Sequence, residues 1–201
     1  MNRLHNICVY CGSSAGNDPA FAAAAEAFGQ TLAKNDIGLV YGGGSYGLMG
    51  ILARAVCDNG GRILGVIPDF LKQRELLFEK AQEIIVTRDM HERKRIMFER
   101  ADAFVALPGG IGTLEELVEQ LTWAQLGHHA KPILLVDINS YWQPLLAVFA
   151  NMEACRFIHS PYVLKYHVCG AVDKVLPTLR AAIAEEAEPE TTETAALIER
   201  M

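Results

Sequence analysis

A short apolar run that leads through a glycine-rich turn into a helical pattern constrains this chain most. Residues 103–107 (AFVAL) are typical of a buried parallel strand, and residues 108–116 (PGGIGTLEE) follow directly. Apolar residues then recur at helical spacing, at Leu114, Leu117, Val118 and Leu121. Glycines let the backbone approach a ligand, and a helix start offers unpaired N–H groups and a positive dipole end. The sequence therefore predicts a phosphate-binding unit here.

Thr113 and Glu116 within this unit allow two interpretations. Thr-x-x-Glu is a capping box, in which the hydroxyl accepts from an amide of the first turn and the carboxylate reaches back. On that interpretation the helix starts at Thr113 and Glu116 only caps it. A carboxylate beside a phosphate site opposes anion binding unless chemistry or a nearby cation requires it. The glycines weaken the interpretation of Glu116 as a cap alone, and the rest of the chain decides between the two.

Length and composition predict one soluble globular domain. The chain has 201 residues, of which 51% are hydrophobic and 21% charged. We expect a cytoplasmic protein without a membrane partner, because there is no signal-like leader and no run of about 18 apolar residues. The net charge is −6, without a basic stripe, so we expect no nucleic-acid partner. Residues 1–184 form the predicted domain, and residues 185–201, with six glutamates, a disordered acidic tail.

Strand and helix patterns alternate along the chain. Strands are predicted over 6–10, 37–41, 62–67, 83–86, 103–107, 132–136 and 163–167. Helices are predicted over 21–32, after residue 50 to about 57, over 89–100, 141–152 and 171–184, and after 113. Residues 69–82 suit a short helix or a mobile cover. This alternation predicts an α/β fold: a single doubly wound, mostly parallel, Rossmann-like sheet of about seven strands with helices on both faces. Ligands bind such sheets beyond the carboxyl ends of the strands, where the strand order reverses.

A second glycine loop follows the second predicted strand. Residues 42–47 (GGGSYG) match the dinucleotide pattern G-x-G-x-x-G between a strand and a helix. The acidic residue expected at the end of the next strand is missing, however, and Pro68 and Asp69 stand there instead. A purely structural turn explains this loop equally well. Taken with the small-residue loop at 11–14, it favours a mononucleotide over NAD as ligand.

The predicted helix over 89–100 carries two cations on its apolar side. Met90, Arg93, Lys94 and Met97 share one side at helical spacing. The methionines should turn this side toward the sheet, where two cations are costly unless anions meet them. The alternative is that both cations extend outward along their aliphatic stems. A bound phosphate and Glu116 are available anions, so we expect the cations to face the site.

The cysteines and histidines give no metal or redox signature. Cys8 and Cys11 form a C-x-x-C, but they sit on a predicted strand without a second ligand pair, so both are interpreted as buried thiols. His91 is assigned a surface or capping role. His128 and His129 are adjacent and do not share a helix face, so no metal site is predicted.

Two stretches together resemble the paired signature of the Lonely Guy (LOG) family. They are residues 89–94 (DMHERK) and 108–116 (PGGIGTLEE), and the loops at 10–14 and 41–50 are similar to that family's too. The likeness runs from about residue 5 to 180. Members are phosphoribohydrolases that cut the N-glycosidic bond of cytokinin riboside 5′-monophosphates to free base and ribose 5-phosphate; many were once labelled lysine decarboxylases. The resemblance implies a homodimer without cofactor, with the substituent of the base near the subunit interface.

The family's motif implies that Arg93 and Glu116 are catalytic. Cleavage of a ribosyl–purine bond builds positive charge on the sugar, which an ionised glutamate can stabilise while it takes a proton from water. Arg93 would hold Glu116 or the ribose hydroxyls. Departure of the base by protonation from solvent or as an anion is left open. The predicted substrate-binding residues are Ser13, Gly43, Gly44, Met90, Lys94, Gly109, Gly110, Gly112 and Thr113. The amides of the last three and the Thr113 hydroxyl would hold the 5′-phosphate.

Three other functions stay open at this point. One is a broader AMP or purine-monophosphate nucleosidase. Another is a non-catalytic nucleotide or cofactor carrier, as in molybdenum-cofactor carrier proteins with similar glycine loops. Lysine decarboxylation is the least favoured, because it normally needs a pyridoxal-phosphate lysine and neither Lys94 nor Lys131 has a recognisable setting for one.

Overall fold

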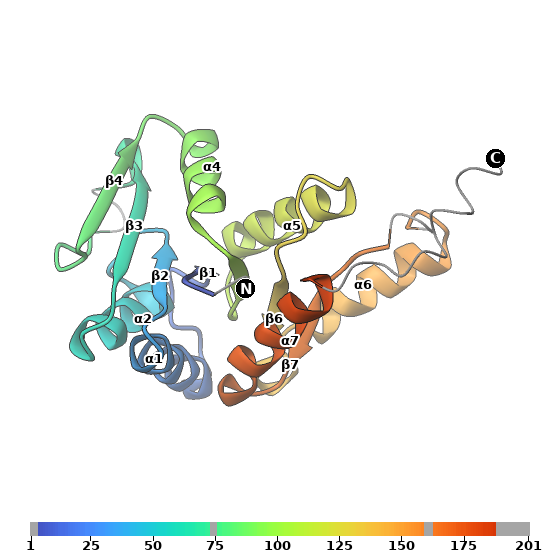
Figure 1. Ribbon diagram of the computed structural model, residues 1–201, viewed down its shortest axis with the longest axis horizontal. Helices are drawn as coiled ribbons and strands as arrows, with labels where there is room; N and C mark the ends of the chain where they lie inside the picture. Colours follow the sequence, from blue (N-terminus) through green and yellow to red (C-terminus); the bar gives the residue numbers. More distant parts are fainter. Residues whose placement is uncertain (1–3, 73–75, 159–162, 188–201) are drawn as a thin grey trace.

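Seven parallel strands form the sheet in the described part of the chain (Figure 1). The computed structural model describes residues 4–72, 76–158 and 163–187. The order across the sheet is β4-β3-β2-β1-β5-β6-β7. The strands are β1 (Asn6–Tyr10), β2 (Gly38–Tyr41), β3 (Ile63–Pro68), β4 (Glu83–Thr87), β5 (Ala103–Ala106), β6 (Ile133–Val136) and β7 (His167–Cys169).

Six α-helices in the described ranges cover both faces of this sheet. They are α1 (Pro19–Lys34), α2 (Gly47–Asp58), α4 (Met90–Arg100), α5 (Ile111–Gln125), α6 (Gln143–Ala154) and α7 (Val175–Ala187), with short 3-10 segments η1 (Asp69–Leu71), η2 (Ile138–Ser140) and η3 (Val172–Lys174). Figure 1 shows α1 and α2 on the side of the sheet opposite α4 and α5. The predicted doubly wound α/β fold is confirmed. No helix among the described residues has the length and apolar character needed to cross a bilayer.

The strands are apolar because they are buried on both faces. Successive side chains of a strand point to opposite faces, so Ile7 and Val9 of β1 join the core under α1, α2 and α7. Cys8 and Tyr10, between and beyond them, join the core under α4, α5 and α6. All four residues of β2, β5 and β6 are buried. Such two-sided burial produces the continuous apolar runs seen in the sequence.

The strand order reverses at β1, which pairs with both β2 and β5. The loops that follow β1 and β5 are therefore neighbours. Gly12 N donates to Pro108 O at 3.1 Å, and Leu48 N, at the start of α2, donates to Gly12 O at 3.0 Å. The predicted gathering of three loops at the carboxyl edge of the sheet is confirmed, and this edge is where doubly wound sheets bind ligands.

Several helices begin at other residues than predicted; α2, for example, begins at Gly47 and not after residue 50. The sequence pattern starts the first helix at residue 21, but α1 begins at Pro19. Asp18 Oδ1 accepts from Ala20 N at 2.8 Å, and proline suits the first helical position. The pattern starts another helix at Tyr141, but α6 begins at Gln143, because residues 138–140 still form the turn that precedes it.

The C-terminal elements also lie later in the chain than predicted. The expected last strand over 163–167 is wrong: β7 spans His167–Cys169, because these are the residues that pair with Leu134, Leu135 and Val136 of β6. The final helix spans Val175–Ala187 rather than 171–184, because residues 172–174 form the 3-10 segment η3 before it. Residues 188–201, most of the predicted acidic tail, lie outside the described residues.

Substitution of Gly47 by alanine is expected to lower the free energy of unfolding by about 2–4 kcal/mol. Gly47 has a φ of 56°, and a Cβ on it would lie 2.3 Å from the carbonyl carbon of Ser13. Gly60 is the matched control, since its φ is 73° but a Cβ there meets nothing within 4 Å. Gly60→Ala should cost only about 1 kcal/mol of backbone strain. Denaturant unfolding of both variants measures this difference, and equal losses would contradict the close packing of α2 on residues 13–14.

Candidate active site

A buried arginine–glutamate pair joins α4 to α5. Arg93 Nη1 lies 2.6 Å from Glu116 Oε1, and Arg93 Nε donates to the carbonyl of Val66 at 3.0 Å. The two side chains are only 8% and 11% exposed. Arg93 reaches this carboxylate because it lies on the buried side of α4 with Met97. The predicted meeting of Arg93 and Glu116 is confirmed.

The start of α5 differs from the predicted capping box. α5 begins at Ile111 with Gly110 as N-cap, so Thr113 lies inside the first turn and does not cap the helix. A Cβ on Gly109 would lie 2.2 Å from Thr113 Oγ1, which shows that the threonine side chain packs against the glycine loop. The capping interpretation is therefore wrong, and the carboxylate of Glu116 is directed to Arg93 instead.

Lys94 has other partners than a phosphate and Glu116. Its Nζ lies 2.6 Å from Glu115 Oε1 and 2.9 Å from Glu119 Oε1. Burial alone lowers the pKa of this ammonium, but the hydrogen bonds and charges of the two glutamates outweigh burial and raise the pKa above its usual value. Lys94 therefore forms a second link between α4 and α5, beside the Arg93–Glu116 pair. Its contact with a substrate stays a prediction.

Gly42 of the second glycine loop leaves room for the guanidinium of Arg93. A Cβ on Gly42 would lie 2.4 Å from Arg93 Nη2 and 3.1 Å from Met49 Sδ. A larger residue would therefore displace the arginine from Glu116. The close packing of Arg93 therefore explains why the first position of the dinucleotide-like pattern is glycine, without a bound phosphate.

The segment after β3 covers the same loop. Residues 69–71 form η1, residues 73–75 lie outside the described ranges, and residues 76–78 then run beside the loop. The contacts are an antiparallel bridge between Gly44 and Leu77, a hydrogen bond from Phe78 N to Gly43 O (3.0 Å) and one from Ser45 N to Leu76 O (2.8 Å). The backbone of 43–45 is thus held by this cover, which favours the structural interpretation of the loop. Substrate contacts of Gly43 and Gly44 stay predictions.

Unpaired backbone amides gather at the start of α5. The first helical hydrogen bond runs from Leu114 N to Gly110 O, so the amides of residues 111–113 have no acceptor within the helix. These amides and the positive end of the helix suit a phosphate. A cavity of about 270 Å³ adjoins the N-cap Gly110 that precedes them, and its lining includes residues 12–16, Phe21, residues 108–110 and Tyr141.

The structure brings the predicted site residues to this edge in three groups. Ser13, Gly109 and Gly110 line the cavity. Gly112 and Thr113 stand in the first turn of α5, and Glu116 follows about 4.5 Å further along the helix axis. The third group lies on α4 and the second glycine loop and comprises Met90, which is half-buried at the first position of α4, Arg93, Lys94, Gly43 and Gly44.

The C-x-x-C cysteines are buried and protonated. Burial raises the pKa of the Cys8 and Cys11 thiols well above their usual range, and the charge of Glu116 raises both further. The thiolate is the form that reacts and binds metals. The interpretation of both residues as buried thiols is confirmed, although Cys11 follows β1 and does not lie in it.

The adjacent histidines lie in the turn after α5 rather than on a helix. The rings of His128 and His129 both pack against Phe98, with centroids 5.5 and 5.3 Å from its ring. Burial lowers the pKa of His129. Within the described residues, no three His, Cys, Asp or Glu side chains are grouped so that they could hold a metal ion.

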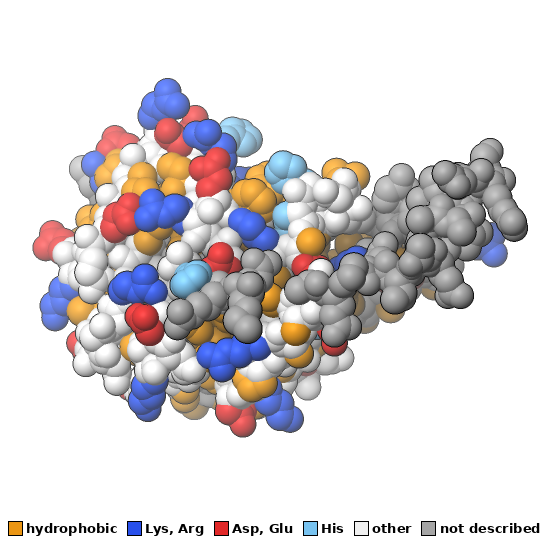
Figure 2. Space-filling model, in the orientation of Figure 1, with side chains coloured by type: hydrophobic (Ala, Val, Ile, Leu, Met, Phe, Trp, Pro, Cys, Tyr) orange, Lys and Arg blue, Asp and Glu red, His pale blue; other side chains and the backbone are white. Residues whose placement is uncertain are grey.

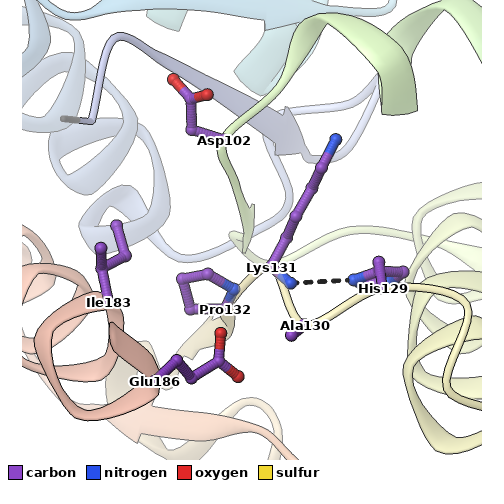
Figure 3. A pocket seen from close by; sticks show the side chains of 7 residues that line it. All are labelled: Asp102, His129, Ala130, Lys131, Pro132, Ile183 and Glu186. Atoms are coloured by element: carbon purple, nitrogen blue, oxygen red, sulfur yellow. Dashed lines mark hydrogen bonds between the residues drawn. The ribbon is translucent and has the colours of Figure 1, made fainter. Parts of the chain in front are cut away.

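A second cavity, of about 350 Å³, lies at the opposite edge of the sheet (Figure 3). It adjoins Asp102 and Pro132, which precede β5 and β6, so it is at the amino ends of these strands. Lys131 points away from Glu186 in this view, and its Nζ donates to Phe98 O at 2.7 Å. Asp102 accepts from two backbone amides at 2.8 Å. This cavity is remote from the glycine loops, so we place the active site at the carboxyl edge.

Several site features carry no motif in the sequence. The cover at 76–78 and the position of Tyr141 over the glycine loop depend on chain segments that approach only in the fold. Glu115 and Glu119 as partners of Lys94 had a weak signal: acidic residues at i and i+4 share a helix face and attract a cation. That signal does not say which cation they meet.

The fold and this site define a class of protein: doubly wound α/β proteins in which a buried arginine–glutamate pair lies behind a glycine-rich helix start. The family model described as "Possible lysine decarboxylase" matches residues 49–179. The cytokinin riboside 5′-monophosphate phosphoribohydrolase LOG7 of Arabidopsis thaliana is 45% identical over 192 residues, which cover 96% of this chain and 86% of LOG7. LOG1 of the same plant is 49% identical over 146 residues, 73% of this chain and 68% of LOG1. The chain belongs to the LOG family of phosphoribohydrolases.

Solved structures with the same fold include a molybdenum cofactor carrier protein from Chlamydomonas reinhardtii. It is 20% identical with a TM-score of 0.68, and the match covers 90% of this chain and 99% of that one. The molybdenum cofactor binding protein from Rippkaea orientalis is 22% identical with a TM-score of 0.67, over 90% and 98% of the two chains. At these identities the likeness shows the fold alone.

Proposed function

We propose that this chain hydrolyses the N-glycosidic bond of cytokinin-type riboside 5′-monophosphates, giving free base and ribose 5-phosphate. The observation that carries the proposal is the buried Arg93–Glu116 pair, about one helical turn behind the free amides of α5. That spacing is comparable to the separation of the 5′-phosphate from the anomeric carbon of a ribose. Membership of the LOG family and the names of its relatives support the same reaction.

The residues supply the steps of this hydrolysis. The amides of residues 110–113 hold the 5′-phosphate, which sets the ribose over the second turn of α5. There the carboxylate of Glu116 faces the anomeric carbon, stabilises the developing oxocarbenium charge and accepts a proton from the attacking water. Arg93 keeps the carboxylate in place through its fork, with Val66 O as a further acceptor.

The environment of the lysines argues against lysine decarboxylation. A Schiff-base lysine must present a free amine to its cofactor. Lys94 Nζ is held between two carboxylates, and Lys131 Nζ lies 4.1 Å from the Phe98 ring centroid, at the edge remote from the glycine loops. The description of the matched family therefore names an activity for which these two lysines are poorly placed.

We infer that the chain works as a homodimer with an interface beside the site. Apolar side chains are exposed along α5, where Ile111 is 82%, Val118 40% and Leu126 70% exposed. Ile111 stands between the glycines of the phosphate loop, so a partner that covers it also borders the substrate.

On the face that Figure 2 shows, the Lys/Arg and Asp/Glu side chains of the described residues are interspersed and form no basic stripe, so we propose no nucleic-acid partner. The cytoplasmic location stays a prediction.

Incubation with isopentenyladenosine monophosphate and AMP tests the proposal, with free base and ribose 5-phosphate measured by chromatography. We expect both products from the first substrate and slower release from AMP. Equal rates would indicate the broader purine-monophosphate nucleosidase. Release of base from neither would refute hydrolysis and favour a nucleotide carrier. The nucleoside without its 5′-phosphate is the matched control and should react far more slowly.

A further inference from the structure

Tyr141 lines the cavity together with the glycine loop and forms a hydrogen bond with that loop. Its Oη donates to the carbonyl of Gly109 at 2.5 Å, although the two residues are 32 positions apart. Both residues line the cavity beside α5. The tyrosine ring packs edge-on against Phe21 and Trp142, with centroid distances of 5.4 and 5.0 Å. The ring is thus held from two sides while the hydroxyl reaches the loop.

The turn that carries Tyr141 is strained and firmly anchored. Asn139 and Ser140, just before it, have φ values of 50° and 63°, which non-glycine residues rarely adopt. Asp137 Oδ1 accepts from Trp142 N at 2.6 Å, and Asn139 Nδ2 donates to Asp18 Oδ2 at 2.7 Å. Strain of this kind persists only where the surroundings enforce it, and it clusters at functional sites.

The bond to Gly109 constrains the peptide between Gly109 and Gly110. In a trans peptide the C=O of one residue and the N–H of the next point in opposite directions. With glycine on both sides, this peptide can rotate easily unless its carbonyl is held. Rotation would redirect the Gly110 amide. The Tyr141 hydroxyl also donates to the carbonyl oxygen of Gly109, which would otherwise repel an anion in the cavity.

We propose that Tyr141 is a positioning residue of the phosphate subsite: it holds the Gly109–Gly110 peptide in the orientation that accepts a 5′-phosphate. The inference rests on the proposed function only in assigning a sugar phosphate to this cavity. Tyr141 acts through the loop, so it is expected to affect binding of the phosphate and not the bond-breaking step.

Tyr141→Phe tests this role, because it removes the hydroxyl and keeps the ring contacts. We expect the dissociation constant of ribose 5-phosphate, measured by calorimetry, to rise about fivefold, equivalent to about 1 kcal/mol. The KM for isopentenyladenosine monophosphate should rise by the same factor, with kcat within twofold. Binding of adenine, which has no phosphate, should not change.

Tyr166→Phe is the matched control, since Tyr166 packs on Phe149 at the other end of the sheet and should leave every value unchanged. An unchanged dissociation constant for ribose 5-phosphate in Tyr141→Phe overturns the inference. Equal weakening of ribose 5-phosphate and adenine, with a lower Tm, overturns it too, because that pattern marks a merely structural residue. If the native protein hydrolyses no monophosphate but Tyr141→Phe still weakens ribose 5-phosphate selectively, the proposed function fails and the inference holds.

Discussion

Glu116→Gln is expected to lower kcat about 10³-fold, with KM for the monophosphate within about threefold of the native value. Glutamine has nearly the same shape and can still accept from Arg93 through its amide oxygen. It carries no negative charge to stabilise the ribosyl cation, however, and it cannot take a proton from water. Steady-state kinetics on isopentenyladenosine monophosphate measure both constants, with ribose 5-phosphate binding as a check on the phosphate subsite.

Glu115→Gln is the matched control for this experiment. Glu115 is the adjacent residue on α5, its side chain is 52% exposed, and Lys94 keeps Glu119 as a second partner when this charge is lost. We expect kcat within about twofold of the native value. A comparable loss in both variants would show that the effect comes from the general charge of α5, and it would remove Glu116 from its catalytic role.

Arg93→Met is expected to lower the free energy of unfolding by about 3–5 kcal/mol and to abolish turnover. Methionine fills the path of the aliphatic stem but leaves the carboxylate of Glu116 buried without its cation and Val66 O without its donor. For a chain of this length the Tm should fall by roughly 10 °C. Thermal unfolding followed by circular dichroism measures the change.

The double variant Arg93→Met with Glu116→Leu separates stability from catalysis. Replacing both members of a buried ion pair by apolar residues of similar volume is often neutral or stabilising. We therefore expect the Tm to return to within a few degrees of the native value, while activity stays absent. If the double variant is as unstable as the sum of the single ones, the two residues are not coupled. The interaction between Arg93 and Glu116 would then contribute no free energy to stability.

Much of the fold could be predicted because its signals are local. The run at 103–107 and the glycines after it mark a buried strand and a tight turn wherever they occur. The exceptions arose where packing overrides a local preference of about 1 kcal/mol. The capping signature of Thr113 was outweighed in this way, since the fold packs its side chain against Gly109. The last strand was misplaced because pairing with β6, and not residue preference, selects residues 167–169.

The sequence predicted that charged side chains on α4 need partners, but it did not predict how these partners are arranged. Two cations on the inward side of a helix require anions, and that requirement is visible in the sequence. Which anion each cation meets is not, because Arg93 and Lys94 differ by about 100° in direction around α4. The crossing of α4 and α5 decides that Arg93 meets Glu116 and that Lys94 meets Glu115 and Glu119.

The sequence by itself determined the layered α/β architecture, the edge at which the glycine loops gather, and the two residues that carry the proposed chemistry. The architecture and the edge follow from strand burial and turn patterns, which are local. The two residues follow from the family's motif, and the cost of unpaired charge on α4 agrees with it. Tertiary structure alone decided the partners of Lys94, the cover over the second glycine loop and the bond from Tyr141 to Gly109. Each of these joins segments far apart in the chain, and their approach depends on how whole helices and turns pack.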